Sequence, residues 1–97
     1  MILKLSIRKP RLSIRKVSIR QVKAARALLG WTQDELAESS GMSGPTVKRL
    51  EAAGGDSIGG RAETAEAIVG ALQKAGVEFI PENGGGIGVR LSKRRRK

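Results

Sequence analysis

The sequence predicts a mainly α fold of four helices followed by a C-terminal β-hairpin. Apolar residues recur at helical spacing in four segments between residues 18 and 76. Three of these segments follow a Ser or Thr that can cap a helix N-terminus, and glycines follow at helix ends. Two short apolar runs, 77–80 and 87–91, flank a glycine-containing loop. With 97 residues the chain has the length of one small domain.

Residues 1–17 are basic and contain a short repeat. Leu-Ser-Ile-Arg-Lys occurs at 5–9 and again at 12–16. Apolar and polar residues alternate within each copy, which is the period of a strand, so residues 2–8 can form an edge strand that ends before Pro10. A basic arm without regular structure explains the same residues equally well. The sequence leaves both alternatives open.

The first helix begins after Ser18, a favourable N-cap, and ends at Gly30, which can adopt a left-handed conformation. Five apolar residues are expected to share its inward face: Ile19, Val22, Ala25, Leu28 and Leu29.

The second and third helices are predicted at 33–39 and 44–52. Thr32 and Glu35 have the spacing of a capping box, and Ser43 caps the next helix, with Pro45 in its first turn. Gly41 permits the tight turn between them. Leu36, Ala37, Val47 and Leu50 are the expected buried residues. Two short helices joined in this way form a helix-turn-helix.

A fourth helix is predicted at 62–75, after a glycine-rich loop at 53–61. Its inward face is expected to hold Ala62, Ala65, Ile68, Val69, Leu72 and Ala75. Gly70 lowers helix stability by about 1 kcal/mol relative to alanine, which suggests a close packing contact there. The hairpin at 77–92 is marginal as an isolated pair of strands. We therefore expect a third strand, from residues 2–8 or from a second subunit.

Composition restricts the function. The chain has no Cys and no His, so it lacks the usual zinc ligands, the cysteine nucleophile and the usual general base. We expect no enzyme activity, no cofactor and no metal. No apolar stretch is long enough to span a membrane and no secretory signal is evident, so a cytoplasmic location is expected. The net charge of +10 is concentrated in residues 1–33 and 83–97, including the basic tail 93–97, which predicts an anionic partner.

Ten positions carry a family resemblance. They are Thr32, Gln33, Leu36, Ala37, Gly41, Met42, Ser43, Val47, Leu50 and Glu51. At this spacing they resemble the helix-turn-helix of the XRE family, the phage repressor and Cro type of DNA-binding domain. The resemblance implies a four-helix repressor-like domain at residues 18–76, with the hairpin and the basic N-terminal arm or edge strand as additions.

The resemblance also implies residue roles. The third helix would enter the major groove of double-stranded DNA. Thr32 and Gln33 would contact a phosphate, and Arg26 would pair with Glu51 to tie the first helix to the third. The expected DNA-facing residues of the third helix are Ser43, Gly44, Pro45, Thr46, Lys48 and Arg49. Gly44 and Pro45 offer no side-chain donor, so base reading falls mainly on Thr46 and Arg49.

Three functions fit these expectations. The first is a sequence-preferring transcriptional regulator, a repressor acting as a homodimer. The second is the antitoxin of a toxin–antitoxin pair, which would use the same DNA-binding module and bind a toxin protein. The third, a basic protein that binds RNA or a membrane surface, is disfavoured because Trp31 and Phe79 are expected in the core rather than in base stacking.

Overall fold

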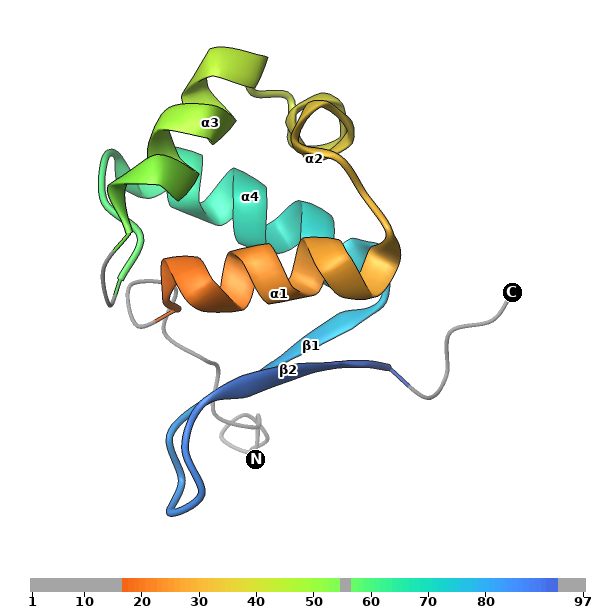
Figure 1. Ribbon diagram of the computed structural model, residues 1–97, viewed down its shortest axis with the longest axis vertical. Coiled ribbons are helices and arrows are strands. Elements are labelled where there is room, and N and C mark those ends of the chain that lie inside the picture. Colours follow the sequence, from red (N-terminus) through yellow and green to blue (C-terminus); the bar gives the residue numbers. More distant parts are fainter. Residues whose placement is uncertain (1–16, 55–56, 93–97) are drawn as a thin grey trace, which may run out of the picture.

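The computed structural model describes residues 17–54 and 57–92. Four helices precede two strands in this part of the chain (Figure 1): α1 (Ile19–Leu29), α2 (Gln33–Ser40), α3 (Gly44–Ala53), α4 (Ala62–Lys74), β1 (Val77–Ile80) and β2 (Gly88–Leu91). This architecture confirms the mainly α fold with a C-terminal hairpin. The predicted bounds of α2, α3 and α4 differ from the observed ones by one residue each, and β2 begins one residue after the predicted Ile87.

Local capping interactions set the helix boundaries. The hydroxyl groups of Ser18, Thr32 and Ser43 each accept a hydrogen bond from a backbone N–H in the first turn of the following helix. Gly30 and Gly41 adopt φ of 71° and 75°, and end α1 and α2 in a left-handed conformation. These conformations are unfavourable for residues with a Cβ, so the two glycines fix where each helix stops.

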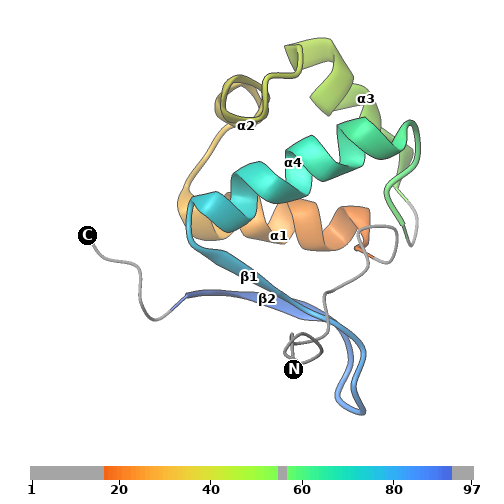
Figure 2. The same ribbon diagram turned by 180° about the vertical axis from the view of Figure 1, so that it is seen from behind.

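The helices enclose one apolar core. α2 packs against α3 and α4, while α1 contacts α3, α4 and both strands. The hairpin lies below α1 and α4, on the side away from α2 and α3 (Figures 1 and 2). The fully buried side chains include Leu36, Val47, Ile68 and Leu72, which come from α2, α3 and α4. The four helices are therefore held by shared burial rather than by a sheet.

Three residues differ from the sequence expectation. Leu28 is 43% exposed although the helical period assigns it to the inward face of α1, and Ala62 is exposed at the first position of α4. Val17, assigned to the N-terminal arm, is fully buried, and its carbonyl accepts a hydrogen bond from the Ile58 N–H. Val17 therefore belongs to the folded domain, whereas residues 2–8, for which the sequence allows an edge strand or a basic arm, lie outside the described residues.

The hairpin is held by a side chain of α1. β1 and β2 pair antiparallel, with Val77 opposite Leu91 and Ile80 opposite Gly88. The Gln21 amide donates hydrogen bonds to the carbonyls of Ile80 (3.3 Å) and Gly88 (2.8 Å), at the last pair of the ladder. The Gln21 Oε1 accepts from the Ser18 N–H at 3.0 Å. Among the described residues the sheet has two strands. Gln21 links the end of the sheet next to the hairpin loop to α1.

Replacing Gln21 with leucine is expected to destabilise the fold. Gln21 is 4% exposed. Leucine at this position would leave the Ser18 N–H and the Ile80 and Gly88 carbonyls without the hydrogen bonds that Gln21 makes to them. One unsatisfied buried group typically costs about 1–3 kcal/mol. Urea unfolding measures the loss, and Gln73→Leu on the exposed side of α4 is the matched control. Equal stability of the two variants would contradict the role of Gln21.

Gly70 makes no close contact, contrary to the sequence expectation. A Cβ at this position would find nothing within 4 Å. Because Gly70 lies inside α4, Gly70→Ala is expected to stabilise the chain by about 1 kcal/mol through helix propensity. Thermal unfolding checks this expectation. A lower melting temperature would show that α4 needs the space in some state of the protein, for example against a second subunit.

Candidate nucleic-acid interface

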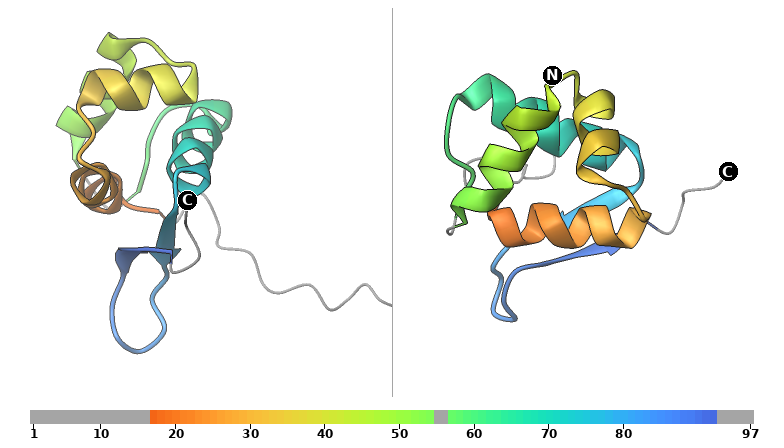
Figure 3. Two further views of the ribbon diagram at one scale, coloured as in Figure 1. Left: turned by 90° about the vertical axis from the view of Figure 1, so that its right-hand side faces the viewer. Right: turned by 45° about the horizontal axis from the view of Figure 1, so that its top comes forward.

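α3 has one buried face and one exposed face. Val47 and Glu51 are buried toward the other helices. Four side chains at the complementary positions are exposed: Pro45, Lys48, Arg49 and Ala52. α3 stands at the outside of the helical layer, and the hairpin lies at the opposite end of the molecule (Figures 1 and 3). The outer face of α3 is therefore not covered by the hairpin.

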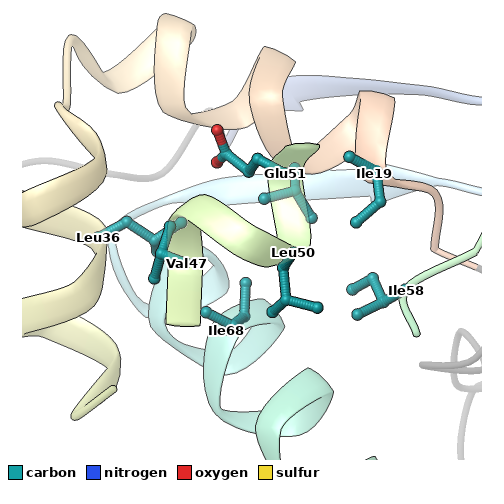
Figure 4. Close-up of a pocket in the computed structure, with 8 residues that line it drawn as sticks. Ile19, Leu36, Val47, Leu50, Glu51, Ile58 and Ile68 are labelled. Atoms are coloured by element: carbon teal, nitrogen blue, oxygen red, sulfur yellow. The ribbon is translucent and has the colours of Figure 1, made fainter. Parts of the chain in front are cut away.

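The space behind α3 is filled by apolar side chains. The close-up in Figure 4 shows residues from α1, α2, α3, α4 and the loop before α4 around a cavity of about 10 Å³. The lining residues are Ile19, Val22, Leu36, Val47, Leu50, Glu51, Ile58 and Ile68. A cavity of this size holds at most about one water molecule, so it offers no ligand site. The apolar side chains around it pack α3 against the other helices.

An ion pair fixes the C-terminal half of α3. The Arg26 Nε donates to Glu51 Oε2 and the Arg26 Nη2 to Glu51 Oε1, both at 2.8 Å. The Arg26 Nη1 donates to the Trp31 carbonyl, also at 2.8 Å, and the Gln33 Nε2 donates to Glu51 Oε1 at 2.9 Å. The network therefore joins α1, the α1–α2 turn, the start of α2 and the end of α3. This geometry shows the Arg26–Glu51 pair that the family resemblance implied.

Burial and hydrogen bonding shift the pKa values of Glu51 and Arg26 in opposite directions. Burial of Glu51 by itself would raise the pKa of its carboxyl group, but hydrogen bonds from Arg26 and Gln33 and the charges of Arg26 and Lys23 lower the pKa below its ordinary value overall. The hydrogen bond to Glu51 raises the pKa of Arg26, against a smaller effect of burial. Both groups are therefore held in their charged forms.

The N-termini of α2 and α3 hold most of the other residues assigned to DNA. At α2, the Thr32 hydroxyl accepts from the Glu35 N–H (3.0 Å), and Glu35 Oε1 accepts from the Thr32 N–H (2.8 Å). At α3, the Ser43 hydroxyl accepts from the Thr46 N–H and lies 2.8 Å from Thr46 Oγ1. These hydroxyl groups are exposed or half-buried, and local hydrogen bonds already orient them.

The structure also brings together two residues that lie ten positions apart in the sequence. Asp34 of α2 places its Oδ1 3.1 Å from where a Cβ of Gly44 would lie. Sequence reasoning missed Asp34, because an acid in the first turn of a helix is ordinarily explained by the helix dipole.

The comparisons with known proteins agree with this geometry. Residues 22–59 match a family model described as Helix-turn-helix. The match covers α1 from Val22 onward, α2, α3 and the following loop. No curated protein matches the chain. No helix in the described part of the chain is long and apolar enough to cross a membrane.

The matched segment contains the ten positions of the sequence resemblance, the capped helix pair and the Arg26–Glu51 pair. The family is one of DNA-binding regulators and not of enzymes. Residues 22–59 therefore form a helix-turn-helix of the XRE type, and this match supports DNA binding by the chain.

Proposed function

We propose that the protein is a repressor that binds a two-fold DNA operator in the cytoplasm as a homodimer. The observation that supports this most is the asymmetry of α3, which is buried along Val47 and Glu51 and exposed along Lys48 and Arg49. A recognition helix needs this arrangement, because it must be rigidly supported on one side and accessible to a major groove on the other.

The residues that the family resemblance assigns to DNA at α3 each have a role in this proposal. Arg49 reads a guanine, whose O6 and N7 accept two hydrogen bonds from one guanidinium group. Thr46 adds a hydroxyl contact, and Lys48 binds a phosphate. Ser43, Gly44 and Pro45 bring the backbone at the N-terminus of α3 close to the DNA. Gly44 and Pro45 supply no side-chain donor, so the number of direct base contacts is small.

The N-terminus of α2 binds a phosphate in this proposal. Helix N-termini favour anions because their first N–H groups point outward. One N–H of the Gln33 amide is directed to Glu51, and the amide has a second N–H to donate to a phosphate. Thr32, whose hydroxyl caps the helix, lies beside it. Gln33 thereby connects DNA contact to the ion pair that holds α3.

A homodimer compensates for the small number of base contacts. Two half-sites about 34 Å apart would place two copies of α3 in successive major grooves. α4 and the hairpin are the proposed subunit interface. Three large apolar residues stay exposed in the described chain: Leu28, Ile87 and Leu91. They support an interface near the hairpin, since Ile87 precedes β2, Leu91 ends it and Leu28 lies in the last turn of α1.

The proposal is tested by selecting bound sites from random duplex DNA and measuring the mass of the complex. We expect enriched sites with two-fold symmetry and half-sites one helical turn apart, bound by two chains. A monomer with DNA at micromolar concentration would contradict the homodimer, and absence of any enriched site would contradict sequence preference. Co-purification with a second small protein in fixed ratio would favour the antitoxin function instead.

A further inference from the structure

The Asp34 carboxylate lies against the position that a side chain of residue 44 would take. Gly44 is the first residue of α3, and the Asp34 Oδ1 lies 3.1 Å from the position of a Cβ on it. A larger residue at position 44 would push this carboxylate aside. Because Gly44 has no side chain, the carboxylate of Asp34 from α2 can lie close to the first residue of α3.

Asp34 differs from Glu35 and Glu51 in its hydrogen bonding. The carboxylate of Glu35 is used in the α2 capping box, and that of Glu51 accepts from Arg26 and Gln33. Within residues 17–54 and 57–92, no hydrogen bond reaches the Asp34 side chain and no Lys or Arg nitrogen lies within 4.0 Å of it. Asp34 is also exposed. Its oxygens can therefore accept hydrogen bonds from a bound molecule.

We propose that Asp34 is a specificity-determining residue that accepts a hydrogen bond from the N4 amino group of a cytosine. The inference rests on the proposed DNA-binding function. The N-terminal end of a recognition helix contacts base edges in the major groove, and Asp34 lies directly beside that end of α3. In the major groove cytosine presents the N4 amino donor without a hydrogen-bond acceptor on the same base, whereas adenine places the N7 acceptor beside its N6 amino donor and guanine presents only acceptors. A carboxylate has only acceptors, so it fits cytosine best.

Helix capping alone does not explain this placement. The α2 N-terminus is already served by Thr32 and Glu35, which form both bonds of a capping box. An exposed carboxylate at a DNA-binding surface weakens binding to every sequence, because it repels phosphates. A specific hydrogen bond to a base can offset this repulsion at the preferred site. Asp34 is therefore expected to reduce non-specific affinity and to favour one base pair.

The test compares site selection by the full-length chain and by three single variants. Asp34→Ala is expected to lose a cytosine preference of at least about fivefold at one position of each half-site, the lower range for one base contact. Asp34→Asn is expected to shift that position to adenine, because an asparagine amide matches the N6 and N7 of adenine. Glu82→Gln, in the exposed hairpin loop far from α3, removes the same charge and should leave the preference unchanged (Figure 1).

Gly44→Ala supplies a second readout. The Cβ it adds crowds the Asp34 Oδ1, which must shift by a few tenths of an ångström, so this variant should weaken the preference at the same position, but less than Asp34→Ala does. Unchanged base preference in Asp34→Ala and Asp34→Asn, with uniformly tighter binding to all DNA, would overturn the inference and leave the proposed function intact. Failure of the unmodified chain to enrich any site would instead overturn the proposed function itself.

Discussion

Replacing Glu51 with glutamine is expected to destabilise the protein by about 3 kcal/mol, the size typical of breaking a buried ion pair from one side. Glu51 is 3% exposed and Arg26 20% exposed, so the lost charge leaves a guanidinium group with little access to water. Glutamine keeps the shape of the side chain, which limits cavity formation. Chemical unfolding with urea measures the change.

The chain contains a matched control for this substitution. Glu78 and Arg90 form an ion pair of similar length, 2.7 Å, on the hairpin, but their side chains are 44% and 68% exposed. Exposed pairs contribute roughly 0–1 kcal/mol, so Glu78→Gln should have a small effect. Similar losses for Glu51→Gln and Glu78→Gln would contradict the importance assigned to the buried network.

The same carboxylate makes stability depend on pH. The pKa of Glu51 is lower in the folded chain than its ordinary value, so its contribution is present at neutral pH. The unfolded chain binds a proton at Glu51 before the folded chain does, so stability falls as the pH drops below about 4.5 and through the folded pKa. Glu51→Gln should be less stable at pH 7 and should show a weaker decline over that range. An identical decline in both proteins would assign the acid sensitivity to other groups.

Replacing Arg49 with alanine is expected to reduce specificity by about 1–3 kcal/mol, the contribution of one bidentate arginine–guanine contact. Arg49 is exposed on the outer face of α3, where no described acidic side chain pairs with it. Affinity for the selected site should fall much more than affinity for random duplex DNA. Titrations on both DNAs at one fixed salt concentration give the ratio directly.

Lys48 provides the comparison within the same helix. Its proposed contact is a phosphate, so Lys48→Ala should weaken binding to selected and random DNA by similar factors. Removing a phosphate contact should also lower the slope of log K against log salt by about 0.9. Equal losses on both DNAs for Arg49→Ala would contradict base reading by Arg49.

The helices could be predicted from sequence because their signals are local. Ser18, Thr32 and Ser43 each cap the helix that follows, and the cap requires only residues within one turn. The position of the hairpin could not be predicted, because the Gln21 amide reaches carbonyls about sixty residues away. A polar residue within a helical pattern gives no sign of such a distant contact.

In the candidate site, too, the features that depend on local residue spacing could be predicted, and those that depend on how the helices cross could not. The spacing of Val47 and Leu50 predicted the buried face of α3, on which the structure buries Val47 and Glu51, and the family resemblance supplied the Arg26–Glu51 pair. Leu28 was also expected inside, but successive residues of a helix point about 100° apart, so Leu28 is turned away from the face on which Leu29 packs against the core. The approach of Asp34 to Gly44 depends on how α2 crosses α3, which residue spacing along the chain does not specify.

Attaching a DNA-cleaving reagent to α3 tests the central claim most directly. The chain contains no cysteine, so a single Pro45→Cys or Glu82→Cys variant carries the reagent at one known site. Both positions are exposed, one at the start of α3 and one in the hairpin loop (Figure 1). Insertion of α3 predicts cleavage of both strands around one major groove of each half-site from position 45, and no cleavage there from position 82. Cleavage from position 82 with none from position 45 would contradict the insertion of α3 into DNA.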